Sequence, residues 1–163
     1  MARQLWMLRH GEAEPHGSRP DADRRLTPRG EQQAADAGAA LAVLGIEFAA
    51  IFTSPKVRAH GTATGAAQGL GKDVVLHAPL ASGFDADEAL TLVSAADDGG
   101  HILVVGHEPD FSGVVHELTG AGVDFKKGGV AGIRLEGTTG RGELVTLLRP
   151  RELAAIARSS SSQ

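Results

Sequence analysis

Arg9, His10 and Gly11 follow directly on the apolar run of residues 5–8 and could together bind and react with an anion. Arginine keeps its charge and donates hydrogen bonds in a fork that fits a phosphate group. Histidine is the side chain most easily used as a nucleophile or proton carrier near neutral pH. Glycine lets the backbone turn sharply and approach a ligand. The triplet predicts an anion site with a reactive imidazole, although alone it is more typical of a loop histidine beside a surface arginine.

Two other segments offer matching chemistry. The apolar run of residues 102–105 ends in Gly106 and His107, and Pro109 then favours the start of a helix. Arg58 is predicted in the first turn of the helix after Ser54-Pro55, where the helix dipole favours an anion. Taken alone, Arg58 could also be an arginine on a solvated helix face. Histidine or arginine therefore follows several predicted strands, and this recurrence favours one shared site.

The elements that must position these residues alternate between strands and helices. A helix is expected from Pro28 to Gly45, with Thr27 as its cap. Thr27 can accept a hydrogen bond from an unpaired N–H group of the first turn, and Pro28 has no N–H group to satisfy. Further helices are predicted after Ser54-Pro55, with Ser54 as the cap, from Asp85 to about residue 96, from Pro109 to Leu118, and over 151–158. Strands are predicted at 5–8, 48–53, 74–77, 102–105, 130–135 and 143–148. The fold class is therefore α/β, a three-layer α/β/α sandwich with a mostly parallel sheet, whose carboxyl edge is the usual ligand site.

Length and composition limit the possible classes. The 163 residues suit one domain over 1–158, with a disordered tail at 159–163. A net charge of −4 argues against nucleic-acid binding, although seven of the sixteen Lys and Arg residues lie between Arg9 and Arg58. The N-terminal apolar run is too short for a signal peptide or membrane span, so no membrane association and a cytoplasmic location are expected. The polar stretch 12–27 is expected to be a functional or disordered loop.

No metal or cofactor is expected. The chain has no cysteine, and no G-x-G-x-x-G, G-x-S-x-G or H-E-x-x-H motif. Residues 69–73 only approximate a phosphate-binding loop, because the first glycine would have to stand at Ala66 and the hydroxyl at Asp73. The remaining histidines are isolated in the sequence and are interpreted as structural or surface residues: His16, His60, His77, His101 and His116.

Residues 8–12 resemble the signature motif of the histidine phosphatase superfamily, which includes the phosphoglycerate mutases. Residues 54–63 and 106–109 are similar to the second and third motifs of that family, in the same order. Asp21, Arg24 and Gly30, together with the short chain, resemble the SixA-type phosphohistidine phosphatases most. The resemblance spans about residues 3–150 and implies a phosphoglycerate mutase-like fold.

The resemblance implies a role for each matching residue. His10 would be a nucleophile that is transiently phosphorylated, with Arg9, Arg58 and His107 around the phosphoryl group. Gly11 would belong to the phosphate site and Arg24 to its rim. Phosphoryl transfer depends mostly on positioning and charge stabilisation, which these side chains can supply without a metal. His10 must present an unprotonated nitrogen, so its other nitrogen should donate to a fixed acceptor such as a backbone carbonyl.

The proton donor to the leaving group is left open, with Glu12, Asp21 and Asp85 as candidates. Asp85 has an alternative role, because Asp85 and Glu88 form a pattern typical of a helix cap.

The leading hypothesis is a metal-independent phosphohistidine phosphatase acting on a protein partner, such as a histidine-containing phosphotransfer or carrier domain. One alternative is a phosphatase for small phosphorylated molecules. Another is a module that binds phosphohistidine without turnover. The presence of His10 argues against this module, because binding alone requires no nucleophile.

Overall fold

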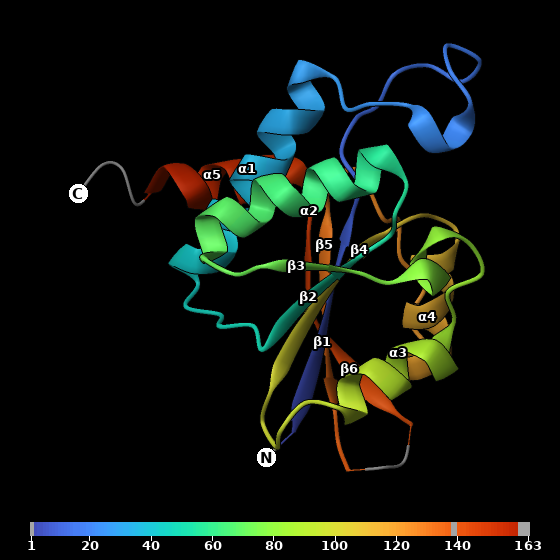
Figure 1. Ribbon diagram of the computed structural model, residues 1–163. Helices are drawn as coiled ribbons and strands as arrows, with labels where there is room; N and C mark the ends of the chain where they lie inside the picture. Colours follow the sequence, from blue (N-terminus) through green and yellow to red (C-terminus); the bar gives the residue numbers. More distant parts are fainter. Residues whose placement is uncertain (1, 138–139, 160–163) are drawn as a thin grey trace.

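The computed structural model describes residues 2–137 and 140–159, which fold around a six-stranded sheet (Figure 1). The spatial order of the strands is β3-β2-β4-β1-β5-β6. Strands β1 to β4 are mutually parallel where they pair, whereas β5 runs antiparallel to both β1 and β6. The strands are β1 (Arg3–Arg9), β2 (Ala50–Thr53), β3 (Val74–Leu76), β4 (His101–Gly106), β5 (Val130–Leu135) and β6 (Gly142–Leu148).

Strand β1 lies inside the sheet, between β4 and β5, and its residues 5–8 are all buried. Its register with β4 pairs Arg9 with Gly106, the last residue of each strand. His10 and His107 immediately follow these two strands, so they leave the sheet side by side at its carboxyl edge. This pairing brings together the two histidines that the sequence places almost a hundred residues apart.

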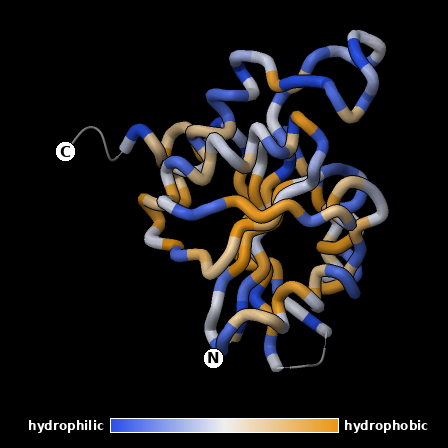
Figure 2. Tube along the Cα trace, in the orientation of Figure 1, coloured by the Kyte–Doolittle hydropathy of each residue, from blue (hydrophilic) through white to orange (hydrophobic). Residues whose placement is uncertain are grey.

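Helices cover both faces of the sheet, which confirms the three-layer architecture (Figure 1). Trp6 and Leu8 belong to the core beneath α1, α2 and α5, whereas Leu5 and Met7 belong to the core beneath α3 and α4. Successive side chains of a strand point to opposite faces, so β1 contributes to both cores. Figure 2 shows the hydrophobic residues concentrated in these central strands. The helices are α1 (Pro28–Val43), α2 (Val57–Leu70), α3 (Ala86–Ser94), α4 (Asp110–Thr119) and α5 (Pro150–Ser159).

The start of α1 is as predicted, because the side chain of Thr27 accepts a hydrogen bond from the N–H of Gly30 and Pro28 is the first helical residue. The start of α2 differs from the prediction. Lys56 is its N-cap residue, and the Ser54 hydroxyl, although it accepts the N–H of Lys56, lies before the helix. Arg58 still falls in the first turn.

Several other boundaries differ by one or two residues. Strand β2 begins at Ala50 instead of residue 48, because the ring of Phe48 packs edge-on against Trp6, with ring centroids 6.5 Å apart, before the strand pairing starts. Helix α3 ends at Ser94 instead of residue 96. The N–H groups of Ala95 and Ala96 bond to carbonyls only three residues earlier, as in a 3₁₀ turn. Ser159 ends α5, and the rest of the expected tail lies outside the described residues.

The polar stretch 12–27 leaves the body of the molecule and returns to it (Figure 1). Its base is closed by an antiparallel bridge between Ala13 and Leu26, and the N–H of Thr27 donates to the carbonyl of Glu12 at 3.0 Å. The single-turn 3₁₀ helix η1 (Asp21–Asp23) lies within it and contacts α2. None of the described helices has the length and apolar character needed to span a membrane.

Candidate active site

His10 follows β1 directly and is only 6% exposed. Its Nδ1 lies 2.8 Å from the carbonyl oxygen of Gly11, which is the kind of backbone acceptor expected from the sequence. With Nδ1–H donating there, Nε2 keeps its lone pair. The pKa of His10 is lowered to about 4, mainly by burial; the charges of Arg58 and Arg9 act in the same direction, and the Gly11 hydrogen bond acts against them. The imidazole is therefore neutral at pH 7.

Gly11 fixes the loop that carries His10. Its N–H donates to the Thr62 hydroxyl at 3.0 Å, and that hydroxyl donates to the carbonyl of Arg58 at 2.8 Å. A Cβ on Gly11 would come within 2.7 Å of the Gly30 carbonyl oxygen, which is too close for any side chain. No role was predicted for Thr62, although it lies within the second motif. Its position four residues after Arg58 on the same helix face was the available signal.

His107 lies beside His10, with ring centroids 5.3 Å apart. Its Nε2 is 2.7 Å from the Ser54 hydroxyl, and both side chains are buried. Burial lowers the pKa of His107 to about 3, and the neighbouring His10 and Arg58 act in the same direction. Ser54 is a second contact that the sequence did not predict, because a serine before a proline and a helix is typical of a cap.

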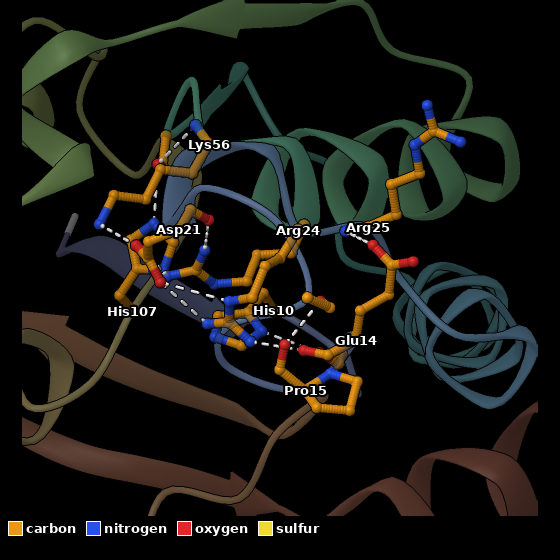
Figure 3. A network of polar contacts seen from close by, with 12 residues as sticks. His10, Glu14, Pro15, Asp21, Arg24, Arg25, Lys56 and His107 are labelled. Carbon is orange, nitrogen blue, oxygen red and sulfur yellow. Dashed lines mark hydrogen bonds and ion pairs between the residues drawn. The ribbon is translucent and has the colours of Figure 1, made fainter.

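The carboxylate of Asp21, a residue of η1, is surrounded by three positive side chains, those of Arg24, Lys56 and Arg58 (Figure 3). The guanidinium of Arg58 donates to the backbone carbonyl of Asp21 at 2.8 Å and to its side chain at 3.3 Å. Arg24 donates to the other carboxylate oxygen at 3.1 Å and to the carbonyl of Glu14 at 2.7 Å. Both arginines are buried, and Arg24 pairs with the same carboxylate as Arg58.

The Asp21 carboxyl is unsuited to proton donation in this arrangement. Partial burial raises its pKa, but the hydrogen bonds from Arg24, Lys56 and Arg58 have the larger combined effect and hold that pKa well below its usual range. The carboxylate therefore stays ionised and neutralises part of the positive charge at the site.

Glu12 and Asp85 are not drawn into the cluster. Glu12 accepts a hydrogen bond from the Thr27 hydroxyl at 3.0 Å and pairs with Arg29 at 3.7 Å, both at the start of α1. Asp85 caps α3 by accepting the N–H of Glu88 at 2.9 Å, the alternative role that its sequence pattern indicated. Within residues 2–137 and 140–159, no group of three or more His, Asp and Glu side chains is arranged to hold a metal ion.

The site contains unsatisfied hydrogen-bonding nitrogens. In the part of the chain that the structure describes, the buried side-chain atoms without a hydrogen-bond partner are the Nε atoms of Arg9 and Arg58 and the Nδ1 of His107. The other end of the Arg9 guanidinium is anchored on the carbonyl of Phe125 at 2.7 Å. Buried polar groups are rarely unpaired, so this clustering around His10 is typical of a site for an anionic ligand.

Known proteins share parts of this sequence and its fold. The model of the histidine phosphatase superfamily (branch 1) matches residues 5–82. An uncharacterized protein of Picosynechococcus sp. is 33% identical over 140 residues, covering 80% of this chain and 84% of that protein.

Among solved structures, the protein histidine phosphatase SixA complexed with tungstate superposes with a TM-score of 0.81 at 22% identity, covering 92% of this chain and 99% of the other. A putative SixA from Nakamurella multipartitia gives 0.77 at 28% identity, covering 92% and 97%. Phosphoserine phosphatase from Entamoeba histolytica in complex with 3-phosphoglyceric acid gives 0.70 at 19% identity, covering 93% and 99%. The chain belongs to the histidine phosphatase superfamily.

Proposed function

We propose that this protein hydrolyses phosphohistidine on a protein partner, with His10 as the nucleophile. The observation that carries the proposal is the state of His10, which is buried and neutral and has Nδ1 tied to the Gly11 carbonyl. An imidazole held in this tautomer presents the Nε2 lone pair for attack on phosphorus.

The reaction then proceeds in two steps. In the first, Nε2 of His10 bonds to phosphorus, the phosphorus–nitrogen bond of the substrate breaks, and the departing imidazole takes up a proton from solvent. In the second, water attacks phosphorus and the bond to Nε2 breaks. Hydrogen phosphate leaves, and one proton returns to solvent. Arg9 and Arg58 offset the charge on the equatorial oxygens in both steps, which is the main requirement of phosphoryl transfer.

His107 contributes a donor if its proton is on Nδ1. The Ser54 hydroxyl already accepts the N–H of Lys56, so it is free to donate its own hydrogen to Nε2 of His107. That arrangement fixes the Nδ1–H tautomer of a neutral ring. The buried Nδ1 then has a proton to donate to a phosphoryl oxygen.

The placement of the carboxylates favours a phosphorus–nitrogen bond over an ester. An alkoxide leaving group benefits from a positioned acid, whereas imidazole, with an ordinary conjugate-acid pKa of about 6.5, leaves easily as a neutral ring. Asp21 is held ionised, and Glu12 and Asp85 are committed to α1 and α3. The fold shared with SixA supports this assignment, and the fold shared with phosphoserine phosphatase supports small esters as the alternative substrates.

The test compares kcat/KM on a phosphohistidine protein with kcat/KM on phosphoserine and 3-phosphoglycerate. We expect the phosphohistidine protein to be preferred at least tenfold, and labelled substrate to give an acid-labile, base-stable phosphoenzyme. His10→Ala should abolish both turnover and labelling while keeping the circular dichroism spectrum. Equal or better turnover of an ester would favour the small-molecule alternative. Binding without turnover would favour the module.

A further inference from the structure

A groove of about 560 Å³ lies beside Arg9 and is lined mostly by positive side chains. It is formed by the start of α1, the loop that precedes β5 and the start of α5, which are far apart in the sequence. Its basic residues are Arg9, Arg29, Lys126, Lys127, Arg149 and Arg151. We call this surface the basic groove.

The positive charge of the basic groove exceeds the negative charge around it. Among the residues that the structure describes, its cations pair with three carboxylates: Glu12 with Arg29, Asp124 with Lys126, and Glu152 with Arg149 and Arg151. Arg29 and Arg151 stay largely exposed, at 76% and 79%. The charge of Glu108 also acts on Arg9, so the six cations face four carboxylates and keep an excess of two positive charges, in a chain whose net charge is −4.

The basic groove is continuous with the proposed phosphoryl site. Arg9 belongs to both, and the N–H of Gly128 donates to the carbonyls of Arg9 and His10 at 3.1 and 3.0 Å. These bonds hold the loop that carries Lys126 and Lys127 against the strand end. The charge of Lys127 also contributes to the lowered pKa of His10. A group bound in the groove therefore lies next to the reacting histidine.

We propose that the basic groove binds acidic side chains that flank the phosphohistidine on the substrate protein. This inference rests on the proposed function and names the kind of protein that the site accepts. Charges at the rim of an interface steer an oppositely charged partner and select against a like-charged one. The net negative charge of the chain disfavours a nucleic acid as the occupant, because phosphate backbones need a basic protein face overall.

The experiment measures binding, so that it does not depend on turnover. Fluorescent peptides carry a phosphonotriazole, a stable analogue of phosphohistidine, flanked by four glutamates, four glutamines or four lysines. Anisotropy gives Kd for the wild type and for Lys126→Ala/Arg151→Ala. The control is Lys72→Ala, which removes an exposed lysine after the far end of α2. Each titration is run at low and high salt, because exposed charges are screened.

We expect the wild type to prefer the glutamate peptide over the glutamine peptide and to bind the lysine peptide least well. The double variant should lose about three- to thirtyfold of the preference for glutamate, as expected for two exposed charge contacts. Lys72→Ala should keep the preference, and high salt should reduce it. Equal affinities for the three peptides, or an equal loss in Lys72→Ala, would overturn the inference.

Two further outcomes separate this inference from the proposed function. A random-sequence DNA duplex that binds more tightly than the glutamate peptide and competes with it would assign the groove to nucleic acid and overturn the inference. If the glutamate preference holds but phosphohistidine proteins are not hydrolysed, the proposed function fails and the acidic-partner surface stands.

Discussion

The neutral state of His10 gives a prediction with a definite magnitude. With an ordinary pKa of about 6.5, roughly 3% of the imidazole would be unprotonated at pH 5. With the pKa lowered to about 4, roughly 90% would be unprotonated at the same pH. The assay is an NMR titration of ¹³C-labelled histidines in the free enzyme, with His10→Ala used to assign the signal. A midpoint between pH 6 and 7 for His10 would refute the reasoning.

The same shift makes folding stability depend on pH. The folded pKa lies below the unfolded one, so the unfolded chain binds more protons between about pH 4 and 6.5, and stability falls as pH drops through that range. For His10 alone, the two pKa values imply a loss of about 2 kcal/mol between pH 7 and pH 5. Urea denaturation should therefore show a smaller pH effect in His10→Ala than in the wild type. The exposed His16→Ala should keep the wild-type effect, and identical pH effects in all three proteins would contradict the prediction.

Three substitutions test the surroundings of His10, each with kcat/KM on a phosphohistidine protein as a measurement. Arg58→Ala should lower kcat/KM by about a thousandfold, as expected when an arginine on a transferring phosphoryl group is lost, whereas Lys72→Ala should not. Asp21→Asn removes an ionised group that competes with phosphate for Arg58, so inorganic phosphate should inhibit about two- to fivefold more tightly. The variant should not lose a hundredfold in kcat, because such a loss would identify Asp21 as the missing acid. Ser54→Ala should lower kcat by about ten- to a hundredfold, by leaving Nε2 of His107 unpaired, with little change in phosphate affinity; an unchanged kcat would argue against a positioning role.

The positions of the proposed reacting residues at the strand ends were predictable, because local patterns determine where those residues lie. Four buried residues followed by Arg9 and His10 indicate a strand that ends at a ligand site, and the parallel pairing of β1 with β4 brings His107 alongside. Thr27 and Pro28 likewise specify a helix start through their own backbone chemistry. Neighbouring residues contain the signal for each strand end and for the helix start, whereas the pairing of β1 with β4 joins distant segments.

The surroundings of the site were less predictable because they depend on contacts between distant segments. Asp21 meets Arg58 only because the stretch 12–27 folds back over α2, and that polar stretch has no periodicity that would indicate its path. Ser54 was interpreted as a possible cap, and its contact with His107 requires β2 and β4 to be neighbours in the sheet. No short motif encodes that strand order.

The positive side chains of the site have two connected effects. In the proposed mechanism, Arg9 and Arg58 provide charge for a phosphoryl group. Their charges also disfavour protonation of His10, so His10 stays unprotonated before the substrate binds. A bound phosphoryl dianion offsets that charge and raises the basicity of Nε2 at the moment when it must attack phosphorus. Asp21 limits the excess positive charge before the substrate arrives. The site can therefore combine anion binding with a reactive neutral histidine, because the substrate itself completes the charge balance.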